Sequence, residues 1–192
     1  MARTHNRTAG TFLTLEGTEG SGKSTQAARL AQALRAEGHA VLLTREPGGT
    51  PAAEQLRAVL LQTNSESLAA ETEAFVILAA RRQHVDHVIA PALRQGAIVI
   101  CDRFVDSTLA YQGYARGLNL KTLRTMNAWA TGGLTPDLTL LFDLPVAKWF
   151  HPRSGLDCSA QHLSGRASAP LGPAAGPHTQ MTQNIVLSWL AG

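Results

Sequence analysis

Eight residues near the start of the chain, Gly17-Thr18-Glu19-Gly20-Ser21-Gly22-Lys23-Ser24, fit the pattern G-x-x-x-x-G-K-[ST] of a phosphate-binding loop. Glycines let the backbone turn tightly, so that successive N–H groups can converge on a polyphosphate. Lys23 could then reach the β- and γ-phosphates, and the Ser24 hydroxyl could bind Mg²⁺. A glycine-rich turn that merely ends in Lys-Ser is the alternative. The motif predicts a site for a nucleoside triphosphate.

The elements around the motif favour this prediction. A strand is predicted at 11–16 and a helix at 25–37, on either side of the loop. Further strands are predicted at 40–44, 97–101 and 137–143, and helices at 51–61, 71–93 (kinked near Pro91), 106–111 and 120–130. Apolar strands that alternate with helices predict an α/β fold, a parallel sheet with helices on both faces.

Charged residues follow three of the predicted strands. Glu19, Arg45 and the pair Asp102-Arg103 each come just after a strand. Ligands of parallel sheets bind beyond the carboxyl ends of the strands, so these charges should meet at one rim.

Composition excludes several classes of protein. A length of 192 residues suits one domain, and the net charge of +3 comes from scattered basic residues, with only 5% aromatic residues. This pattern disfavours a nucleic-acid surface and fits small anionic substrates better. We expect no membrane span and a cytoplasmic location, because no long apolar run or secretory signal is present. Cys101 is expected to be a small buried residue. His84 and His87 are expected to be solvated helix residues, because no third metal ligand is evident.

Three more segments resemble the thymidylate kinase family. They are Thr44-Arg-Glu-Pro-Gly-Gly-Thr50, Leu78-Ala-Ala-Arg-Arg-Gln-His84, and Asp102-Arg-Phe-Val-Asp-Ser-Thr-Leu-Ala-Tyr-Gln-Gly113. The resemblance covers about residues 11–147. It implies the fold of a P-loop nucleoside monophosphate kinase. It also implies a homodimeric, cytosolic, Mg²⁺-dependent enzyme that transfers the γ-phosphoryl of ATP to dTMP, giving dTDP for dTTP biosynthesis.

The resemblance also implies roles for four catalytic residues. Besides Lys23, Arg103 should bridge the acceptor phosphate and the transferring group, and Asp102 should orient Mg²⁺ or its waters. Glu19 should face the deoxyribose 3′-hydroxyl or a Mg²⁺-bound water. The alternatives are a structural ion pair between Asp102 and Arg103, and a merely exposed Glu19.

By the same resemblance, dTMP should contact Arg45, Arg57, Ile77, Arg81, Arg103, Thr108, Tyr111 and Gln112. Arg57 and Arg81 match positions that contact the phosphate and the thymine, whereas Arg45 and Glu46 could instead mainly shape their turn. Tyr111 matches a residue beside the sugar, where a ring disfavours a 2′-hydroxyl. Ile77 stands where the family usually has a phenylalanine that stacks on thymine, so we predict weaker dTMP binding than in relatives with the ring.

The sequence leaves two other functions open. One is a small P-loop kinase that acts on a different nucleotide or metabolite. The other is a nucleotide-binding remnant without catalysis. A GTPase is disfavoured, because the chain has no Asn-Lys-x-Asp element.

The chain departs from the family after Val146. Only Asp157 of the 14 acidic residues lies beyond Asp143, and the family's arginine-bearing lid with Asp-Arg-x-Glu is absent. We expect residues 1–10 to be flexible, residues 11–147 to form the kinase core, and residues 148–192 to be mostly irregular, apart from 184–190. A segment translated out of frame is our hypothesis. Without lid arginines, turnover should fall by ~10³–10⁵, and the missing last strand should expose a sheet edge that invites aggregation.

Overall fold

The computed structural model describes residues 10–62, 67–143, 160–162 and 165–167. Its central sheet has four parallel strands in the order β2-β3-β1-β4. They are β1 (Thr11–Gly17), β2 (Val41–Arg45), β3 (Ile98–Asp102) and β4 (Leu138–Phe142). The four predicted strands and their parallel arrangement are confirmed, with most boundaries shifted by one residue.

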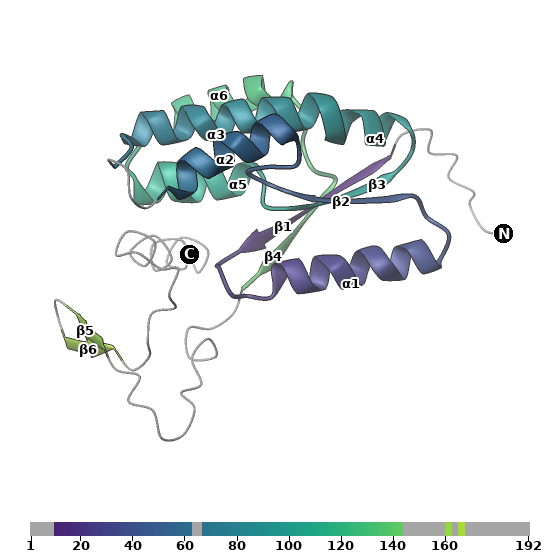
Figure 1. Ribbon diagram of the computed structural model, residues 1–192, viewed down its shortest axis with the longest axis horizontal. Helices are drawn as coiled ribbons and strands as arrows, with labels where there is room; N and C mark the ends of the chain where they lie inside the picture. The colour runs from purple at the N-terminus through teal and green to yellow at the C-terminus, as the bar shows by residue number, and fades with distance from the viewer. Residues whose placement is uncertain (1–9, 63–66, 144–159, 163–164, 168–192) are drawn as a thin grey trace.

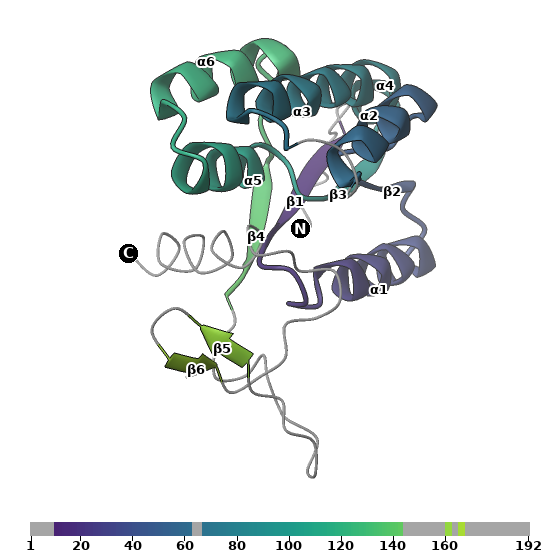
Figure 2. The ribbon, with the colours of Figure 1, turned by 60° about the vertical axis from the view of Figure 1, so that its left-hand side comes forward.

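Helices cover both faces of this sheet (Figures 1 and 2). Of the described helices, only α1 (Lys23–Ala36) lies on one of the two faces. The other face carries α2 (Pro51–Leu61), α3 (Ala70–His84), η1 (Val85–Ile89), α4 (Ala90–Arg94), α5 (Val105–Thr108), η2 (Leu109–Ala115) and α6 (Leu120–Thr131). The predicted α/β fold with helices on both faces is therefore confirmed.

The alternation of side chains along the strands builds two separate cores. Leu15 and Ile100 face α1, where they pack against Ala27 and Ala31. On the opposite face, a second cluster contains Phe12, Val85, Ile89, Val99, Cys101 and Phe104. Successive strand residues point to opposite faces, so each strand contributes to both clusters and holds the two helical layers on one sheet.

Local sequence signals fix several helix ends. Pro51 occupies the first turn of α2, and the Thr50 hydroxyl accepts a hydrogen bond from the Ala53 N–H at 3.0 Å. Asn119 caps α6 in the same way, and α6 ends at Gly132 in the left-handed conformation with φ 62°. These caps explain why the predicted bounds of the two helices are close to those observed.

The segment predicted as one long helix contains a π-turn just before Pro91. Within η1 the N–H of Ala90 donates to the carbonyl of Val85, five residues back. Proline has no N–H, and its ring would clash with the carbonyl four residues earlier, so the helix widens there. The predicted disturbance near Pro91 thus takes the form of a π-turn. The predicted helix at 106–111 is likewise a short α5 followed by the π-helix η2.

Strand β4 lies at an edge of the four-stranded sheet that the described residues form. Its side chains Leu138 and Leu141 are 49% and 45% exposed. An exposed edge strand can pair with another chain, so the predicted tendency to aggregate stays a prediction.

Farther along the chain, β5 (Ala160–His162) pairs antiparallel with β6 (Gly165–Ala167). Our other expectations for residues 148–192, including an ordered 184–190, lie outside the described residues. The expectation of a flexible N-terminus, apart from residue 10, lies outside them too.

Candidate active site

The predicted phosphate-binding loop joins β1 to the start of α1. Gly20 and Gly22 have φ values of 76° and 86°, which L side chains rarely adopt. Gly17 has no room for a side chain, because a Cβ there would meet the Phe142 carbonyl oxygen at 2.6 Å. No side chain caps α1, so the first N–H groups of this helix are left for an anion.

Lys23 is folded back onto this loop. Its Nζ donates to the Thr18 carbonyl at 2.6 Å and to the Ser21 hydroxyl at 3.3 Å. Burial and the nearby positive charge of Arg103 lower the pKa of Lys23 from its ordinary value of 10.5 to about 8. A bound polyphosphate would replace these weak acceptors with opposite charge.

Ser24 and Asp102 meet beside the loop. The Ser24 hydroxyl donates to Asp102 Oδ2 at 2.5 Å. The other carboxylate oxygen, Oδ1, is buried and has no hydrogen-bond partner. A buried carboxylate oxygen without a partner is costly, and a cation or its waters would satisfy it.

Arg103 has an unusual backbone, with φ 71°, in the left-handed region. A non-glycine residue in this region costs about 1–3 kcal/mol unless its surroundings hold it there. Its N–H donates to the Leu15 carbonyl at 2.9 Å, its carbonyl accepts from the Cys101 thiol at 3.1 Å, and Nη1 donates to Ser107 at 3.2 Å. The guanidinium carbon also lies 5.4 Å from the centre of the Tyr111 ring. These contacts fix the orientation of the Arg103 side chain. The alternative of a structural ion pair with Asp102 gains no support, because no such pair forms in the described part of the chain.

Glu16, which our sequence analysis missed, helps to hold the segment that follows Arg103. Its carboxylate accepts hydrogen bonds from the Phe104 N–H at 2.7 Å and the Ser107 hydroxyl at 2.6 Å. Burial raises the pKa of Glu16. The Ser107 that contacts Arg103 is therefore itself held by Glu16. The available signal was a carboxylate inside a strand whose other residues are uncharged.

A second buried network surrounds Glu46, and it corrects our prediction for one histidine. Glu46 accepts from Arg81 Nε at 2.7 Å and faces His84 Nδ1 at 3.1 Å, while His84 Nε2 lies 2.7 Å from the Thr44 hydroxyl. His84 has no exposed surface, so the prediction of a solvated residue was wrong for it. His87 is exposed as predicted. The error arose because helical spacing alone does not show which face meets a buried glutamate.

Arg81 is held by four protein acceptors. Besides Glu46, they are the Thr108 hydroxyl at 2.9 Å, the Phe104 carbonyl at 2.9 Å, and the Asn127 side-chain oxygen. The residue is only 2% exposed. Its guanidinium therefore has a fixed orientation at the cleft wall.

The two remaining arginines predicted at the site lie near the turn after β2. Arg45 Nη2 lies 3.1 Å from both carboxylate oxygens of Glu54, and the Gly49 N–H donates to Glu54 at 2.9 Å. That backbone N–H, followed by the charge of Arg45, lowers the pKa of Glu54. Arg57 Nη1 donates to the Pro47 carbonyl at 2.9 Å. Arg45 thus stabilises its turn, which was the alternative that we considered, and it also lines the cleft.

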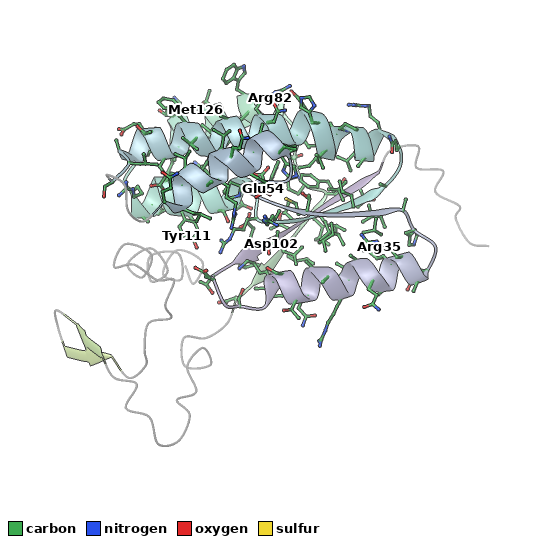
Figure 3. All side chains as sticks on the ribbon, in the orientation of Figure 1. Arg35, Glu54, Arg82, Asp102, Tyr111 and Met126 are labelled. Carbon is green, nitrogen blue, oxygen red and sulfur yellow. The ribbon has the colours of Figure 1, made fainter. Side chains whose placement is uncertain are left out.

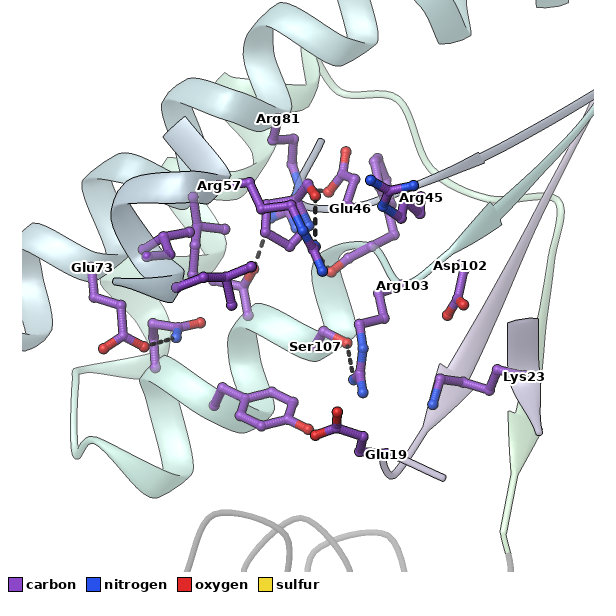
Figure 4. A pocket seen from close by; sticks show the side chains of 18 of the residues that line it. Glu19, Lys23, Arg45, Glu46, Arg57, Glu73, Arg81, Asp102, Arg103 and Ser107 are labelled. Carbon is purple, nitrogen blue, oxygen red and sulfur yellow. Dashed lines mark hydrogen bonds and ion pairs between the residues drawn. The ribbon is translucent and has the colours of Figure 1, made fainter. Parts of the chain in front are cut away.

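One cleft of about 910 Å³ brings these groups together. All eight residues predicted to bind dTMP line it, as do the four predicted catalytic residues. Of the loop residues, Gly17, Thr18 and Ser21 lie outside the lining. Figure 4 shows Lys23 and Asp102 at one end, Glu73 at the other, and Arg103 between them. In Figure 3, Asp102 and Tyr111 lie on the side of the helical layer that faces α1, opposite Arg82 and Met126.

A membrane-spanning helix and a metal-binding cluster are both absent from the described residues. None of their helices is long and apolar enough to cross a membrane. Within the same residues, no cluster of three or more His, Cys, Asp or Glu side chains could hold a metal ion. Cys101 is fully buried as predicted, and burial raises the pKa of its thiol well above the usual range.

A glycine loop between a parallel strand and a helix, opening on a cleft lined by arginines, defines a P-loop α/β protein. The sequence model of the thymidylate kinase family matches residues 15–153. The chain belongs to the thymidylate kinase family.

Individual relatives agree with this assignment. The chain is 56% identical to the thymidylate kinase of Pseudomonas putida (strain GB-1) over 138 residues, 72% of this chain and 66% of the relative. It is 58% identical to that of Pseudomonas fluorescens (strain SBW25) over 137 residues, 71% and 65% of the two chains. The chain therefore spans slightly less than two thirds of these relatives' length.

The crystal structure of thymidylate kinase from Ehrlichia chaffeensis has a similar fold. It matches with a TM-score of 0.67 and 40% sequence identity, covering 73% of this chain and 80% of that one. A second family model, described as the oxidoreductase YgfK N-terminal TIM-barrel domain, matches residues 142–192. Most of that stretch lies outside the described residues.

Proposed function

We propose that this chain transfers the γ-phosphoryl group of ATP to dTMP and so produces dTDP. The observation that carries the proposal is the single cleft, with a phosphate loop at one end and Arg57, Arg81 and Gln112 farther along it. Phosphoryl transfer needs donor and acceptor held in line, and positive charge on the moving group, more than it needs covalent help. Family membership does not favour the alternative of a kinase with a different acceptor.

At the donor end, residues 17–24 would bind the triphosphate through backbone N–H groups and Lys23. Lys23 would leave the Thr18 carbonyl and donate to the phosphates instead. Because Lys23 is only 5% exposed, its charge would act on the phosphates with little screening by water.

Ser24 and Asp102 fit a magnesium ion. Mg²⁺ prefers oxygen ligands and usually takes one or two from the protein, with substrate phosphates and waters completing the set. The Ser24 hydroxyl and the Asp102 carboxylate supply such oxygens, and the partnerless Oδ1 of Asp102 would gain a favourable contact. When bound, Mg²⁺ would neutralise phosphate charge. Glu19, at the mouth of the loop, would face the sugar hydroxyl or a water of that ion.

At the acceptor end, Arg57 and Arg103 would bind the dTMP phosphate. Arg103 lies between the two ends of the cleft (Figure 4), and its charge already acts on Lys23. It would therefore contact both the acceptor phosphate and the transferring group. Tyr111, under the Arg103 guanidinium, would lie beside the sugar.

The same proposal assigns the base to the inner part of the cleft. Ile77, Arg81, Thr108 and Gln112 would contact thymine. Thr108 and Arg81 are hydrogen-bonded to each other, so Thr108 would act partly by fixing the arginine.

Arg103→Met tests this proposal most simply. Formation of labelled dTDP from dTMP and γ-labelled ATP should fall by ~10²–10³, the usual loss for a preorganised charge at the transition state. Arg94→Met, an exposed arginine on α4, is the matched control and should leave the rate unchanged. A dTDP yield that is unaffected by Arg103→Met would contradict the proposal. ATP binding without any product would favour the catalytically silent remnant.

We further propose that turnover is slow, because the sequence after Val146 has no recognisable arginine-bearing lid. A missing transition-state arginine costs ~10³–10⁵ in rate, or about 4–7 kcal/mol. A chimera that carries the lid of a Pseudomonas relative should therefore be faster by that factor. Equal rates for the chimera and the native chain would refute this step.

We also propose a cytoplasmic homodimer that buries α2, α3 and α6. Large apolar side chains on these helices face solvent: Leu61, Phe75 and Trp129 are 61%, 60% and 85% exposed. Exposed apolar side chains of this size are typical of association surfaces. The wild-type chain should sediment as a dimer and Phe75→Glu as a monomer, whereas a monomeric wild type at micromolar concentration would contradict a dimer.

A further inference from the structure

Glu73 lies at the end of the cleft that is away from Lys23 (Figure 4), and Gln112 contacts it there. Gln112 Nε2 donates to Glu73 Oε1 at 2.5 Å. An ionised carboxylate only accepts hydrogen bonds, so the amide nitrogen of Gln112, and not its oxygen, must face Glu73. This contact therefore fixes which way round the amide lies.

Arg116 holds the carboxylate of Glu73 in place. Its Nε lies 3.4 Å from Glu73 Oε2, and its Nη2 donates to the Leu68 carbonyl at 2.6 Å. The side chains of Arg116 and Glu73 are 31% and 27% exposed, so water only partly screens the pair. The pair keeps Glu73 directed at Gln112.

The oxygen end of the Gln112 amide is then left for a ligand. Gln112 is 3% exposed and lines the cleft, and no side chain of the described residues donates to its Oε1. Arg81, which lines the same cleft, carries only N–H donors. Its Nε, its Nη1 and one N–H of Nη2 donate to four protein acceptors, which prevent the guanidinium from turning and leave the second N–H of Nη2 as a donor. The inner cleft thus offers one fixed donor and one fixed acceptor.

This pair of groups distinguishes pyrimidine bases. The edge of thymine and uracil has a carbonyl oxygen beside an N–H, which match a donor and an acceptor. Cytosine has an amino group beside a bare ring nitrogen, which places a donor against Arg81 and an acceptor against Gln112 Oε1. Two donors or two acceptors that face each other in a buried site lower the affinity for the ligand, so a cytosine nucleotide should bind more weakly than a thymine or uracil nucleotide.

From this geometry, and resting on the proposed function, we infer that Glu73, held by Arg116, is a specificity-determining residue for 2,4-dioxopyrimidine nucleotides. It acts by locking the Gln112 amide with its oxygen toward the base. Glu73 does not touch the base, so it is a positioning residue. Without it, the amide could rotate by half a turn at little steric cost and present a donor that suits the cytosine ring nitrogen.

Glu73→Gln tests the inference, because it keeps the side-chain shape but can donate as well as accept. The dissociation constants of dTMP, dUMP and dCMP are measured by calorimetry for the wild-type chain and the variant. We expect the dCMP/dTMP ratio to fall by about tenfold or more and the dUMP/dTMP ratio to stay constant. Glu71→Gln, an exposed position in the first turn of the same helix, removes the same charge and should change neither ratio.

A double-mutant cycle makes the test independent of simple loss of structure. Gln112→Ala should reduce the discrimination against dCMP to the part that Arg81 provides, and adding Glu73→Gln to it should have no further effect on the ratio. An unchanged dCMP/dTMP ratio in Glu73→Gln, or an equal loss of affinity for all three nucleotides, would overturn the inference. A wild-type chain that does not prefer dTMP over dCMP at all would instead contradict the proposed function, and the inference with it.

Discussion

Lys23 should take up a proton when a triphosphate binds, and the extent of uptake follows from its pKa of about 8 in the free protein. A triphosphate beside the ammonium should return the pKa toward its ordinary value, because opposite charge favours the charged form. Uptake should then be ~0.1 proton at pH 7, ~0.5 at pH 8 and ~0.9 at pH 9. Below pH ~7, Lys23 is charged with or without ligand, so uptake there should vanish.

The same shift predicts how affinity depends on pH. Apparent affinity should be constant below pH ~7 and should fall by up to about tenfold per pH unit above pH 8, since the neutral amine must be protonated first. The total effect is limited to about 3 kcal/mol, the free energy that corresponds to a shift from 10.5 to about 8.

Calorimetry in buffers of different ionisation enthalpy measures this uptake directly. Lys23→Arg is the control, because a guanidinium stays charged throughout the range and should show no uptake above pH 8. Arg103→Met should move the onset of uptake to higher pH, because Arg103 is the second cause of the lowered pKa after burial. Uptake in the wild type that does not change between pH 7 and pH 9 would refute the reasoning.

Three further predictions follow from particular contacts. Gly49→Ala should lower the free energy of unfolding in urea by about 2–4 kcal/mol, because φ is +88° and a Cβ would lie 2.4 Å from the His84 ring. An unchanged free energy of unfolding would contradict the described packing. Arg81→Met should cost about 3–5 kcal/mol in the same assay, since it leaves the Glu46 carboxylate buried beside His84 without its arginine, and a loss below 1 kcal/mol would contradict it. Ile77→Phe should tighten dTMP binding by about 1–3 kcal/mol in calorimetry, and an unchanged dissociation constant would sink the stacking argument.

The sequence predicted the architecture well because its signals are local. Apolar runs bounded by glycine or charge located all four strands of the described sheet, and caps such as Thr50 and Gly132 set helix ends. The π-turns were not predictable in the same way. The π-turn before Pro91 follows from the missing N–H and the bulk of the proline ring, and neither π-helix changes the apolar periodicity of the sequence.

Site residues that belong to a sequence motif could be predicted, whereas residues whose role depends on buried tertiary contacts could not. The loop, Arg103 and Gln112 were found by pattern and resemblance, and five of the loop residues line one cleft with Arg103 and Gln112. Glu16 and Glu73 were missed, because only tertiary contacts with Ser107 and Gln112 give them a role. A single sequence shows which residues are charged, but not which of them share a buried hydrogen bond.

The central claim is that one cleft holds donor and acceptor together, and a bridging ligand tests it most directly. An adenosine and a thymidine joined through a polyphosphate would reach from the phosphate loop to Gln112. We predict that calorimetric competition shows this compound displacing both ATP and dTMP with one-to-one stoichiometry, and binding more tightly than either nucleotide alone. If it displaced only one of them while the other remained bound, the two sites would be separate and the account would be contradicted.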